Sequence, residues 1–545
     1  MLIVREEIEK SSKLLGFLVR LMSDETTPST IKKEFRVSAN LFAKLKSRKS
    51  RIERRIDKTK LGDICKPVFT ASNIHFELSD KTRGFVHGGI GAVHLLVQKL
   101  GLAEAIDQHL HLLKIHLPYH ESDHVLNIAY NALCDGICLQ DIELRRTDEV
   151  FLDALGAQRI PDPTTAGDFC RRFRPGHIQV LQDVFHQSRL KVWAEQPADF
   201  FEQAIMDMDS TLVETTGKCK QGMDIAYDGT WGYHPLILSL ANTREVLSVV
   251  NRSGNRPSAE GAAEQVDRCL KVCFQGGFRK VLLRGDTAFS QTEHLDRWNA
   301  DRRVRFLFGY DARANVVELA EQLPERAWKP LDRTKPKAIG AVERPKPEKV
   351  KDRMVKRREF QTLRLKSEQV AEFTYQPVAC EEEYRMIVVR KNISKEKGEQ
   401  HLYDEIRYFF YLTNDWVLDA DEIVFLANDR CDQENLLSQL LSGCHALHAP
   451  VDNLESNWAY MVMTALAWNL KAWLALSVPE TPGRWREKQR SDKRRLLGME
   501  FRTFVQAFVR LPCQLVRAGR RLIYRLLSWN PNLPVFFRVV QALGG

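Results

Sequence analysis

Residues 204–211 have the sequence AIMDMDST, in which a short apolar run leads directly into two aspartates. The run predicts a buried strand that ends at Asp207 and Asp209. Residues two apart in a strand point to the same face, so both carboxylates should lie on one side of the sheet. Two like charges placed so close repel each other unless a cation lies there. The stretch therefore predicts a sheet with an acidic site at one edge.

Further apolar runs around this stretch define the fold class. They predict buried strands at 235–240, 246–250, 281–284, 305–308 and 409–412. A helix is expected from Ser258 to about Cys273, and a longer one from about 421 to 441. This order of strands and helices is that of a mixed α/β layer with both sheet faces covered.

Two more acidic residues occupy comparable positions. Asp286 follows the strand at 281–284, and Glu434 lies within the predicted helix around 427–435. Three carboxylates from two strand ends and a helix can converge at one sheet edge. Hard oxygen ligands with open positions suit Mg²⁺, and a two-metal site with ions about 3.5–4 Å apart carries out phosphoryl transfer. The alternative is that these acids are solvated loop residues, which are common at strand ends of α/β folds.

Four short motifs occur in a fixed order along the chain. They are D-x-D-x-T at 207–211, Gly-Tyr-x-Pro at 232–235, Arg-x-Gly-Asn at 252–255 and Arg-x-Asp at 284–286, and Leu-Pro-Cys at 511–513 and Gly-Arg-Arg at 519–521 follow near the C-terminus. With this ordered set the chain resembles bacterial insertion-sequence transposases of the DDE type, from about Phe69 to the end. Each motif alone is weak, whereas the set in this order is specific.

The resemblance implies a fold and a domain organisation. The fold is α/β, with a ribonuclease-H-like mixed sheet core that is interrupted by a β-rich insertion and flanked by helical N- and C-terminal regions. The insertion explains why Glu434 comes 148 residues after Asp286. The expected regions are a basic N-terminal region at 1–84, a helical, DNA-binding domain at 85–200, the first part of the core at 201–329, the insertion at 330–405, the second part of the core at 406–475, and a basic helical C-terminal region at 476–545.

The resemblance also implies the site residues. Asp209, Asp286 and Glu434 would be the catalytic triad that holds two Mg²⁺ or Mn²⁺ ions, with Asp207 as an auxiliary ligand. Arg430 lies one helical turn before Glu434 and would hold a DNA phosphate, although a surface arginine at this position is usually solvated. Ala427 and Leu441 stand where the wider group has Tyr and Lys, so secondary DNA contacts at those two positions are in question.

The implied activity is cut-and-paste movement of an insertion sequence. One metal would activate a water that cleaves the phosphodiester at the transposon end, and the freed 3′-hydroxyl would attack target DNA without a covalent enzyme intermediate. The implied partners are double-stranded DNA, as terminal inverted repeats and as target, and a second copy in a synaptic homodimer. A hydrolytic nuclease with the same core and an inactive DNA-binding derivative are the alternatives. The intact triad argues against the inactive derivative.

Charge and composition fit a DNA-binding protein of the cytoplasm. The net charge is +10, and the stretches 31–60 and 484–525 hold twelve and thirteen Lys and Arg against three acids each. A third basic stretch covers 331–358, where an exposed loop is expected. We expect all three stretches to bind DNA in a salt-dependent manner, although the charges at 31–60 are equally compatible with a solvated helix face.

Membrane insertion and disulfide bonding are not expected. The longest apolar stretch, 460–478, contains Asn469 and Lys471 and predicts a buried helix instead of a membrane span. The eleven scattered cysteines indicate a reducing compartment, so we expect a soluble, cytoplasmic protein without a membrane partner. The resemblance to insertion-sequence transposases further implies a bacterial, nucleoid-associated protein.

One motif is expected to be fortuitous. His120 to His124 matches the H-E-x-x-H pattern of zinc proteases, which needs both histidines on one helix face. Pro118 lies just upstream, and a helix beginning near Ser122 would leave His120 outside it. We therefore expect no zinc at these histidines.

Overall fold

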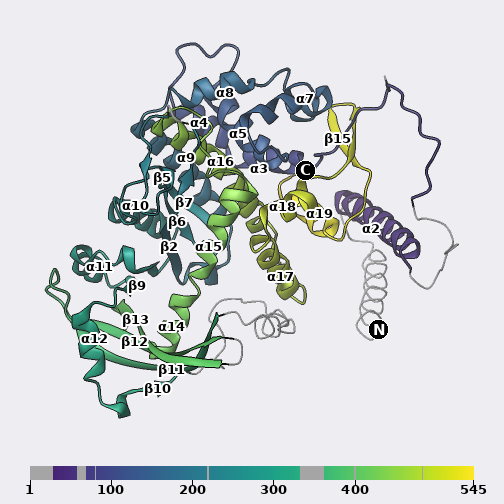
Figure 1. Cartoon of the computed structure of the whole chain (residues 1–545). Coiled ribbons are helices and arrows are strands. Elements are labelled where there is room, and N and C mark those ends of the chain that lie inside the picture. Colours follow the sequence, from purple (N-terminus) through teal and green to yellow (C-terminus); the bar gives the residue numbers. More distant parts are fainter. Residues whose placement is uncertain are drawn as a thin grey trace.

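The computed structural model describes residues 29–57, 69–79, 81–217, 220–331, 361–397, 400–481 and 483–544. A sheet of nine strands carries helices on both faces, and the helical part of the molecule extends away from one end of it (Figure 1). Nearly all of the basic stretch at 331–358 lies outside the described residues.

One end of the sheet, from the edge strand β7 inward, has the strand order β7-β6-β2-β8-β9. On one side, β2 (Ala204–Ser210) pairs antiparallel with β6 (Leu236–Leu240), which pairs antiparallel with β7 (Glu245–Val250). On the other side, β2 runs parallel to β8 (Val281–Gly285), and β8 runs parallel to β9 (Val304–Tyr310). This is the ribonuclease-H-like arrangement, so the predicted fold class is confirmed, and the bounds of these five strands lie within two residues of those predicted. The strand predicted at 409–412 is instead the end of a much longer one, Gln400–Thr413.

Four further strands extend the same sheet beyond β9. They are β13 (Gln400–Thr413), β12 (Tyr384–Lys397), β11 (Gln361–Tyr375) and the short β10 (Lys329–Pro330), all antiparallel to their neighbours. The expected β-rich insertion is thus continuous with the core sheet. The boundary expected at residue 405, between the insertion and the second part of the core, falls inside β13.

The two faces of the sheet contact different helices. Ile205, Leu282 and Leu307 pack with α14 (Ala420–Asn428) in a small apolar cluster. The alternate residues, such as Met206 and Leu283, belong to the main core. This alternation follows from the two-residue period of a strand, and it places Asp207 and Asp209 on the same face as Ile205, toward α14.

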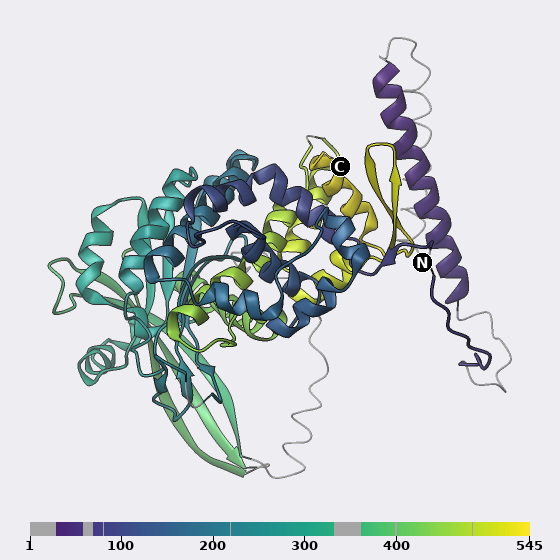
Figure 2. The ribbon, with the colours of Figure 1, turned by 90° about the horizontal axis from the view of Figure 1, so that it is seen from above.

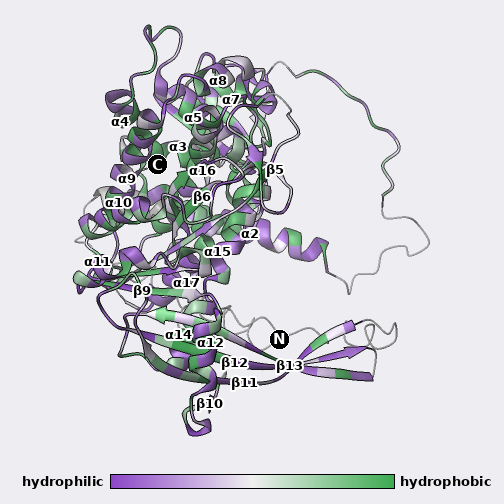
Figure 3. Ribbon diagram, turned by 60° about the vertical axis from the view of Figure 1, so that its left-hand side comes forward, coloured by the Kyte–Doolittle hydropathy of each residue, from purple (hydrophilic) through white to green (hydrophobic). Residues whose placement is uncertain are grey.

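The main core surrounds α16 (Leu454–Leu476), which is buried along almost its entire length. The buried helix expected around 460–478 is therefore confirmed. Helices that pack near it include α3 (Ile90–Leu100), α4 (Leu102–His109), α5 (Glu121–Leu133), α8 (Pro163–Cys170) and α9 (Pro175–Ala194). Hydrophobic residues gather in this helical part and in the centre of the sheet, whereas the far ends of β11–β13 are largely hydrophilic (Figure 3). In the described part of the chain, no helix has the length and apolarity to cross a membrane.

Two helices differ from the prediction. The helix expected from Ser258 begins at Ala262 instead, as α10 (Ala262–Gln275). Arg252 donates hydrogen bonds to the carbonyls of Pro257, Ser258 and Glu260, which holds that segment as a loop.

The helix expected over 421–441 is divided into α14, α15 (Cys431–Ser438) and a π-helical turn at Gln439–Gly443. The break has a specific cause. Arg284 donates to the carbonyl of Leu426 at 2.7 Å, the group that a continuous helix would offer to the N–H of Arg430. The N–H of Arg430 bonds to Ala427 instead.

The two terminal segments of the described chain lie together. A hairpin of β14 (Cys513–Ala518) and β15 (Arg521–Leu526) pairs with β1 (Gly84–Phe85), and α2 (Ser29–Arg55) lies beside the hairpin (Figure 2). The remaining longer helices are α7 (Glu149–Leu155), α11 (Leu295–Ala300), α12 (Ala314–Glu321), α17 (Arg486–Leu497) and α19 (Leu533–Ala542).

Candidate active site

Asp207 and Arg284 are directly opposite each other on the parallel strands β2 and β8. Arg284 donates from Nε and Nη2 to the two oxygens of Asp207, at 2.6 and 2.7 Å, and both side chains are almost completely buried. The third donor contact of Arg284 is the one to Leu426 at the end of α14. The pair therefore joins the two central strands to the point where α14 stops.

Two residues further on lie Asp209, still within β2, and Asp286, the first residue after β8. Asp209 is half-buried and accepts a hydrogen bond from Nη1 of Arg430 at 3.0 Å. Burial raises the pKa of Asp209, the positive charge of Arg430 opposes that rise, and the negative charge of the nearby Asp286 adds to it. The two aspartates therefore interact electrostatically, as carboxylates converging on a cation site would.

Asp286 turns out of β8 and caps a short helical turn by accepting the N–H of Ala288 at 2.9 Å. The neighbouring strand leaves space for this turn because it carries Gly309. A Cβ at that position would lie 2.9 Å from the backbone nitrogen of Thr287. The sequence around Asp286 thus folds so that its carboxylate stays at the sheet edge beside Asp209.

Glu434 lies on α15, one turn after Arg430, and its side chain is exposed. The preceding residue, Gln433, is buried and attaches α15 to β6 by contacts with Ser239 and with the carbonyl of Ile237. The structure thus brings Asp209, Asp286 and Arg430 together and places Glu434 on the adjoining helix. Within the described residues, no group of three His, Cys, Asp or Glu side chains is close enough to hold a metal ion.

Two other motifs from the sequence stabilise each other near the site. The backbone N–H of His234 bonds to the carbonyl of Arg252, and Nε of Arg252 donates to the carbonyl of His234 at 2.9 Å. Gly254 permits close packing, because a Cβ there would lie 2.8 Å from the carbonyl oxygen of Gly232. The Gly-Tyr-x-Pro and Arg-x-Gly-Asn segments therefore form one interlocked unit.

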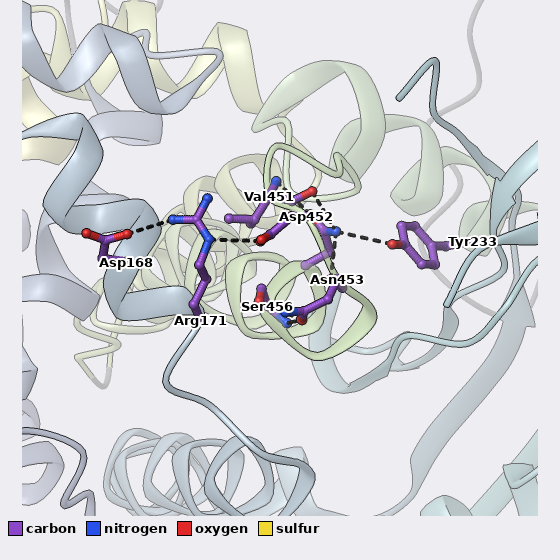
Figure 4. Close-up of polar contacts among 8 residues, drawn as sticks. Asp168, Arg171, Tyr233, Val451, Asp452, Asn453 and Ser456 are labelled. Atoms are coloured by element: carbon purple, nitrogen blue, oxygen red, sulfur yellow. Dashed lines mark hydrogen bonds and ion pairs between the residues drawn. The ribbon is translucent and has the colours of Figure 1, made fainter. Parts of the chain in front are cut away.

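Tyr233 connects this unit to the start of α16. Its hydroxyl donates to the carbonyl of Gln221 at 2.8 Å and lies 3.5 Å from the amide nitrogen of Asn457. Arg171, the residue after α8, pairs with Asp452 at 2.9 Å, in the loop just before α16. The side chains of Arg171 and Tyr233 approach this loop from opposite sides (Figure 4). The motif residue Tyr233 lies on β5 (Trp231–Tyr233), in a separate small sheet, and thus joins this small sheet to the helical region.

The comparisons with known proteins bear directly on this arrangement. The model of the family described as "Transposase DDE domain group 1" matches residues 85–544, which is most of the chain. The chain belongs to this DDE transposase family. A comparison with curated proteins gave no match.

Among solved structures, the chain is similar to one in the "Cryo-EM structure of piggyBac transposase synaptic complex with hairpin DNA". The identity is 10% and the TM-score 0.36, over 77% of this chain and 81% of that chain.

Two contacts of this transposase were not anticipated from the sequence. Arg284 was recognised only as part of a motif, and its pairing with Asp207 engages the residue that was expected to be an auxiliary metal ligand. Gln433 was not considered at all. The sequence held a signal for both contacts. Arg284 stands in an apolar strand and Gln433 beside an acid on a helix, and a polar side chain that becomes buried needs a hydrogen-bond partner.

The two histidines of the H-E-x-x-H motif lie in different environments of the transposase. His120 is the cap residue before α5, which begins at Glu121, so the prediction that it lies outside the helix is confirmed. His124 is buried within α5 and stacks on Phe169 with ring centroids 4.3 Å apart. That zinc is not bound at these residues stays a prediction.

Proposed function

We propose that the chain is a cut-and-paste transposase that cleaves DNA at the ends of an insertion sequence and joins those ends to target DNA. The observation that carries this proposal is that Asp209, near the end of β2, and Asp286, the residue directly after the parallel strand β8, lie at one sheet edge, with Arg430 bound to Asp209. Acidic residues at this sheet edge, together with membership of the DDE transposase family, favour phosphodiester chemistry.

In this proposal Asp209, Asp286 and Glu434 hold two Mg²⁺ or Mn²⁺ ions. The two aspartates fit such a cation because they offer hard carboxylate oxygens, and because the negative charge of Asp286 helps to raise the pKa of Asp209. When bound, the ions supply an activated water and stabilise the leaving 3′ oxygen. Asp207 is engaged by Arg284, so we assign it to positioning β2 and β8 and not to the metal.

Arg430 has two partners in this scheme. Without the cation it forms an ion pair with Asp209, which offsets part of the acidic charge at the site. With DNA bound, its guanidinium holds a phosphate beside the reacting bond. Ala427 and Leu441, at the Tyr and Lys positions of the wider group, lie on α14 and on the π-helical turn respectively, outside the helix that carries Glu434.

The proposed substrates are double-stranded DNA with the element's terminal inverted repeats and a second duplex as target, bound by a homodimer. The deciding experiment incubates purified protein with Mg²⁺, a duplex that carries an element end and a supercoiled target plasmid. Covalent joining of the end to the plasmid is the expected result. Cleavage without joining would favour a hydrolytic nuclease, and binding without cleavage would favour an inactive derivative. Short inverted repeats in the DNA that flanks the gene would identify the end sequence to use.

A further inference from the structure

The C-terminal segment of the chain is rich in positive charge. Residues 501–545 contain seven arginines and neither aspartate nor glutamate. Three of these arginines, Arg520, Arg521 and Arg525, lie at the tip and along the outer strand of the β14–β15 hairpin, and all three are exposed. Among the described residues, no carboxylate lies within ion-pair distance of any of them.

Helix α2 lies against the free edge of this hairpin. Leu45 of α2 is buried, and Nη1 of Arg48 donates to the carbonyls of Leu526 and Ser528 at 2.9 and 3.2 Å. Because β15 is the last strand of its sheet, its edge carbonyls would otherwise face solvent. Two segments more than 470 residues apart in sequence are therefore adjacent in space (Figure 2).

The exposed surface of α2 is also basic. Lys44, Arg51 and Arg55 are spaced seven and four residues apart, so they lie along one flank of the helix over about 16 Å. All three are exposed, and no ion-pair partner for them exists in the described part of the chain.

In other basic parts of the molecule, several cations are neutralised by carboxylates. On α17, Arg490 and Lys493 both pair with Glu480 at 2.8 Å, and Arg494 pairs with Glu487 at 2.6 Å. The hydrophilic arm of β11–β13 shows the same pattern, for example between Lys366 and Asp404. A DNA phosphate would have to displace a carboxylate from each of these cations, which reduces what each contact contributes.

We propose that α2 and the β14–β15 hairpin together form one surface that binds the phosphate backbone of duplex DNA away from the acidic site. This rests on the proposed function, since it assigns the DNA contact of the same enzyme. Duplex DNA carries one negative charge per about 1.7 Å of axis, so a stripe of cations of this length can neutralise several phosphates. The surface refines the expectation that the whole of 484–525 binds DNA, because it includes the hairpin and omits α17.

The test measures affinity for a fluorescent duplex of arbitrary sequence over a range of salt concentrations. The variants are a helix set (Lys44→Gln, Arg51→Gln, Arg55→Gln), a hairpin set (Arg520→Gln, Arg521→Gln, Arg525→Gln) and both sets combined. Each lost phosphate contact should reduce the log–log salt slope by about 0.9, so each set should reduce it by up to about 2.7. Replacing Lys44 with Arg, and each of the arginines with Lys, should leave the log–log salt slope unchanged, because the positive charge is kept.

A charge-matched control replaces Arg490, Lys493 and Arg494 of α17 with Gln, and it should leave the slope close to that of the unmodified protein. The melting temperature of every variant is measured to confirm folding. Unchanged slopes in the helix and hairpin sets, or an equal loss in the α17 control, would overturn this surface while leaving the proposed function intact. Failure of the unmodified protein to bind any duplex would instead contradict the proposed function itself. If the helix and hairpin sets lost binding to anionic phospholipid vesicles while their DNA binding was unaffected, the surface would be assigned to membranes and the proposal would also be overturned.

Discussion

Asp207 and Arg284 form a doubly hydrogen-bonded ion pair between two parallel strands, and both are at most 2% exposed. Because Arg284 also binds the carbonyl of Leu426, this pair determines where α14 ends. The chain can then turn so that Arg430 reaches Asp209. An internal ion pair thereby sets the position of the residues that line the acidic edge.

Replacing one member of this pair should destabilise the protein strongly. The substitution Arg284→Met leaves the charge of Asp207 buried without a partner, and we expect a loss of about 3–5 kcal/mol in the free energy of unfolding. The double variant Asp207→Leu, Arg284→Met should lose less, since no charge remains buried. Urea denaturation of both variants measures the difference. A double variant that is no more stable than Arg284→Met would show that the unpaired buried charge of Asp207 is not the cause of the loss in stability.

Removing a carboxylate of the proposed triad should abolish chemistry but not DNA binding. We expect Asp209→Asn, Asp286→Asn and Glu434→Gln to lose Mg²⁺-dependent end cleavage, because an amide keeps the shape of the side chain and removes the charge that holds the metal. Affinity for the end duplex should change little. The measurement is cleavage of a labelled duplex alongside equilibrium binding.

A neighbouring acid on the same helix provides the control for Glu434. Asp432 is exposed and lies 3.7 Å from Arg244, so Asp432→Asn should keep most of the cleavage activity. If Asp432→Asn is inactive and Glu434→Gln is active, the third ligand has been assigned to the wrong residue of α15.

Arg430 should contribute to catalysis through its charge. A hydrogen bond to a charged group contributes about 1.5–3 kcal/mol, so Arg430→Gln should slow cleavage at saturating DNA by about 10- to 150-fold. Arg430→Lys should recover part of that loss, because it keeps the charge but not the two-pronged geometry. Single-turnover rates test this. Equal rates for the Gln variant and the unmodified protein would restrict Arg430 to its ion pair with Asp209.

The stability of the protein should depend on pH through His124. Burial lowers the pKa of His124 from 6.5 to about 4, and its Nδ1 has no hydrogen-bond partner in the described structure. Because the folded pKa lies below the unfolded one, this contribution is fully present above about pH 6.5 and is lost as the pH falls toward 4. The whole effect amounts to about 3 kcal/mol. His124→Gln should therefore show a weaker loss of unfolding free energy between neutral pH and about pH 5 than the unmodified protein. Parallel curves of unfolding free energy against pH for the two proteins would contradict the prediction.

The same histidine should not bind zinc. His120 is the cap residue of α5, and His124 stacks on Phe169 inside the fold, so they do not present two imidazoles one turn apart on one helix face. Elemental analysis of chelator-treated protein should find no stoichiometric zinc. Zinc that disappears in the His120→Ala, His124→Ala double variant would refute this.

The strands of the core were predictable because burial follows local patterns. Apolar runs such as 236–240 and 281–283 are buried on both faces of the sheet, and nothing distant is needed to recognise them. The candidate carboxylates were predictable for a related reason, since each stands in a short motif at a strand end or beside an arginine one helical turn away.

The helix boundaries were less predictable because distant side chains alter them. Leu426 and Arg284 are 142 residues apart, so no local signal announces that α14 loses this carbonyl. The start of α10 depends in the same way on Arg252, which holds the loop before it.

The amino-acid sequence alone predicted a mixed α/β sheet with acids at one edge and several basic segments, since periodicity is a property of neighbouring residues. The resemblance carried by the ordered motifs implied that this sheet is ribonuclease-H-like. Which basic segments keep their charge free depended on the folded chain. On α17, Arg490, Lys493 and Arg494 pair with Glu480 or Glu487. The proposed DNA-binding cations Lys44, Arg51 and Arg55 of α2 and Arg520, Arg521 and Arg525 of the hairpin have no carboxylate partner among the described residues. Electrostatic neutralisation acts over a few ångströms in space, and only folding brings the partners from separate parts of the chain within that distance.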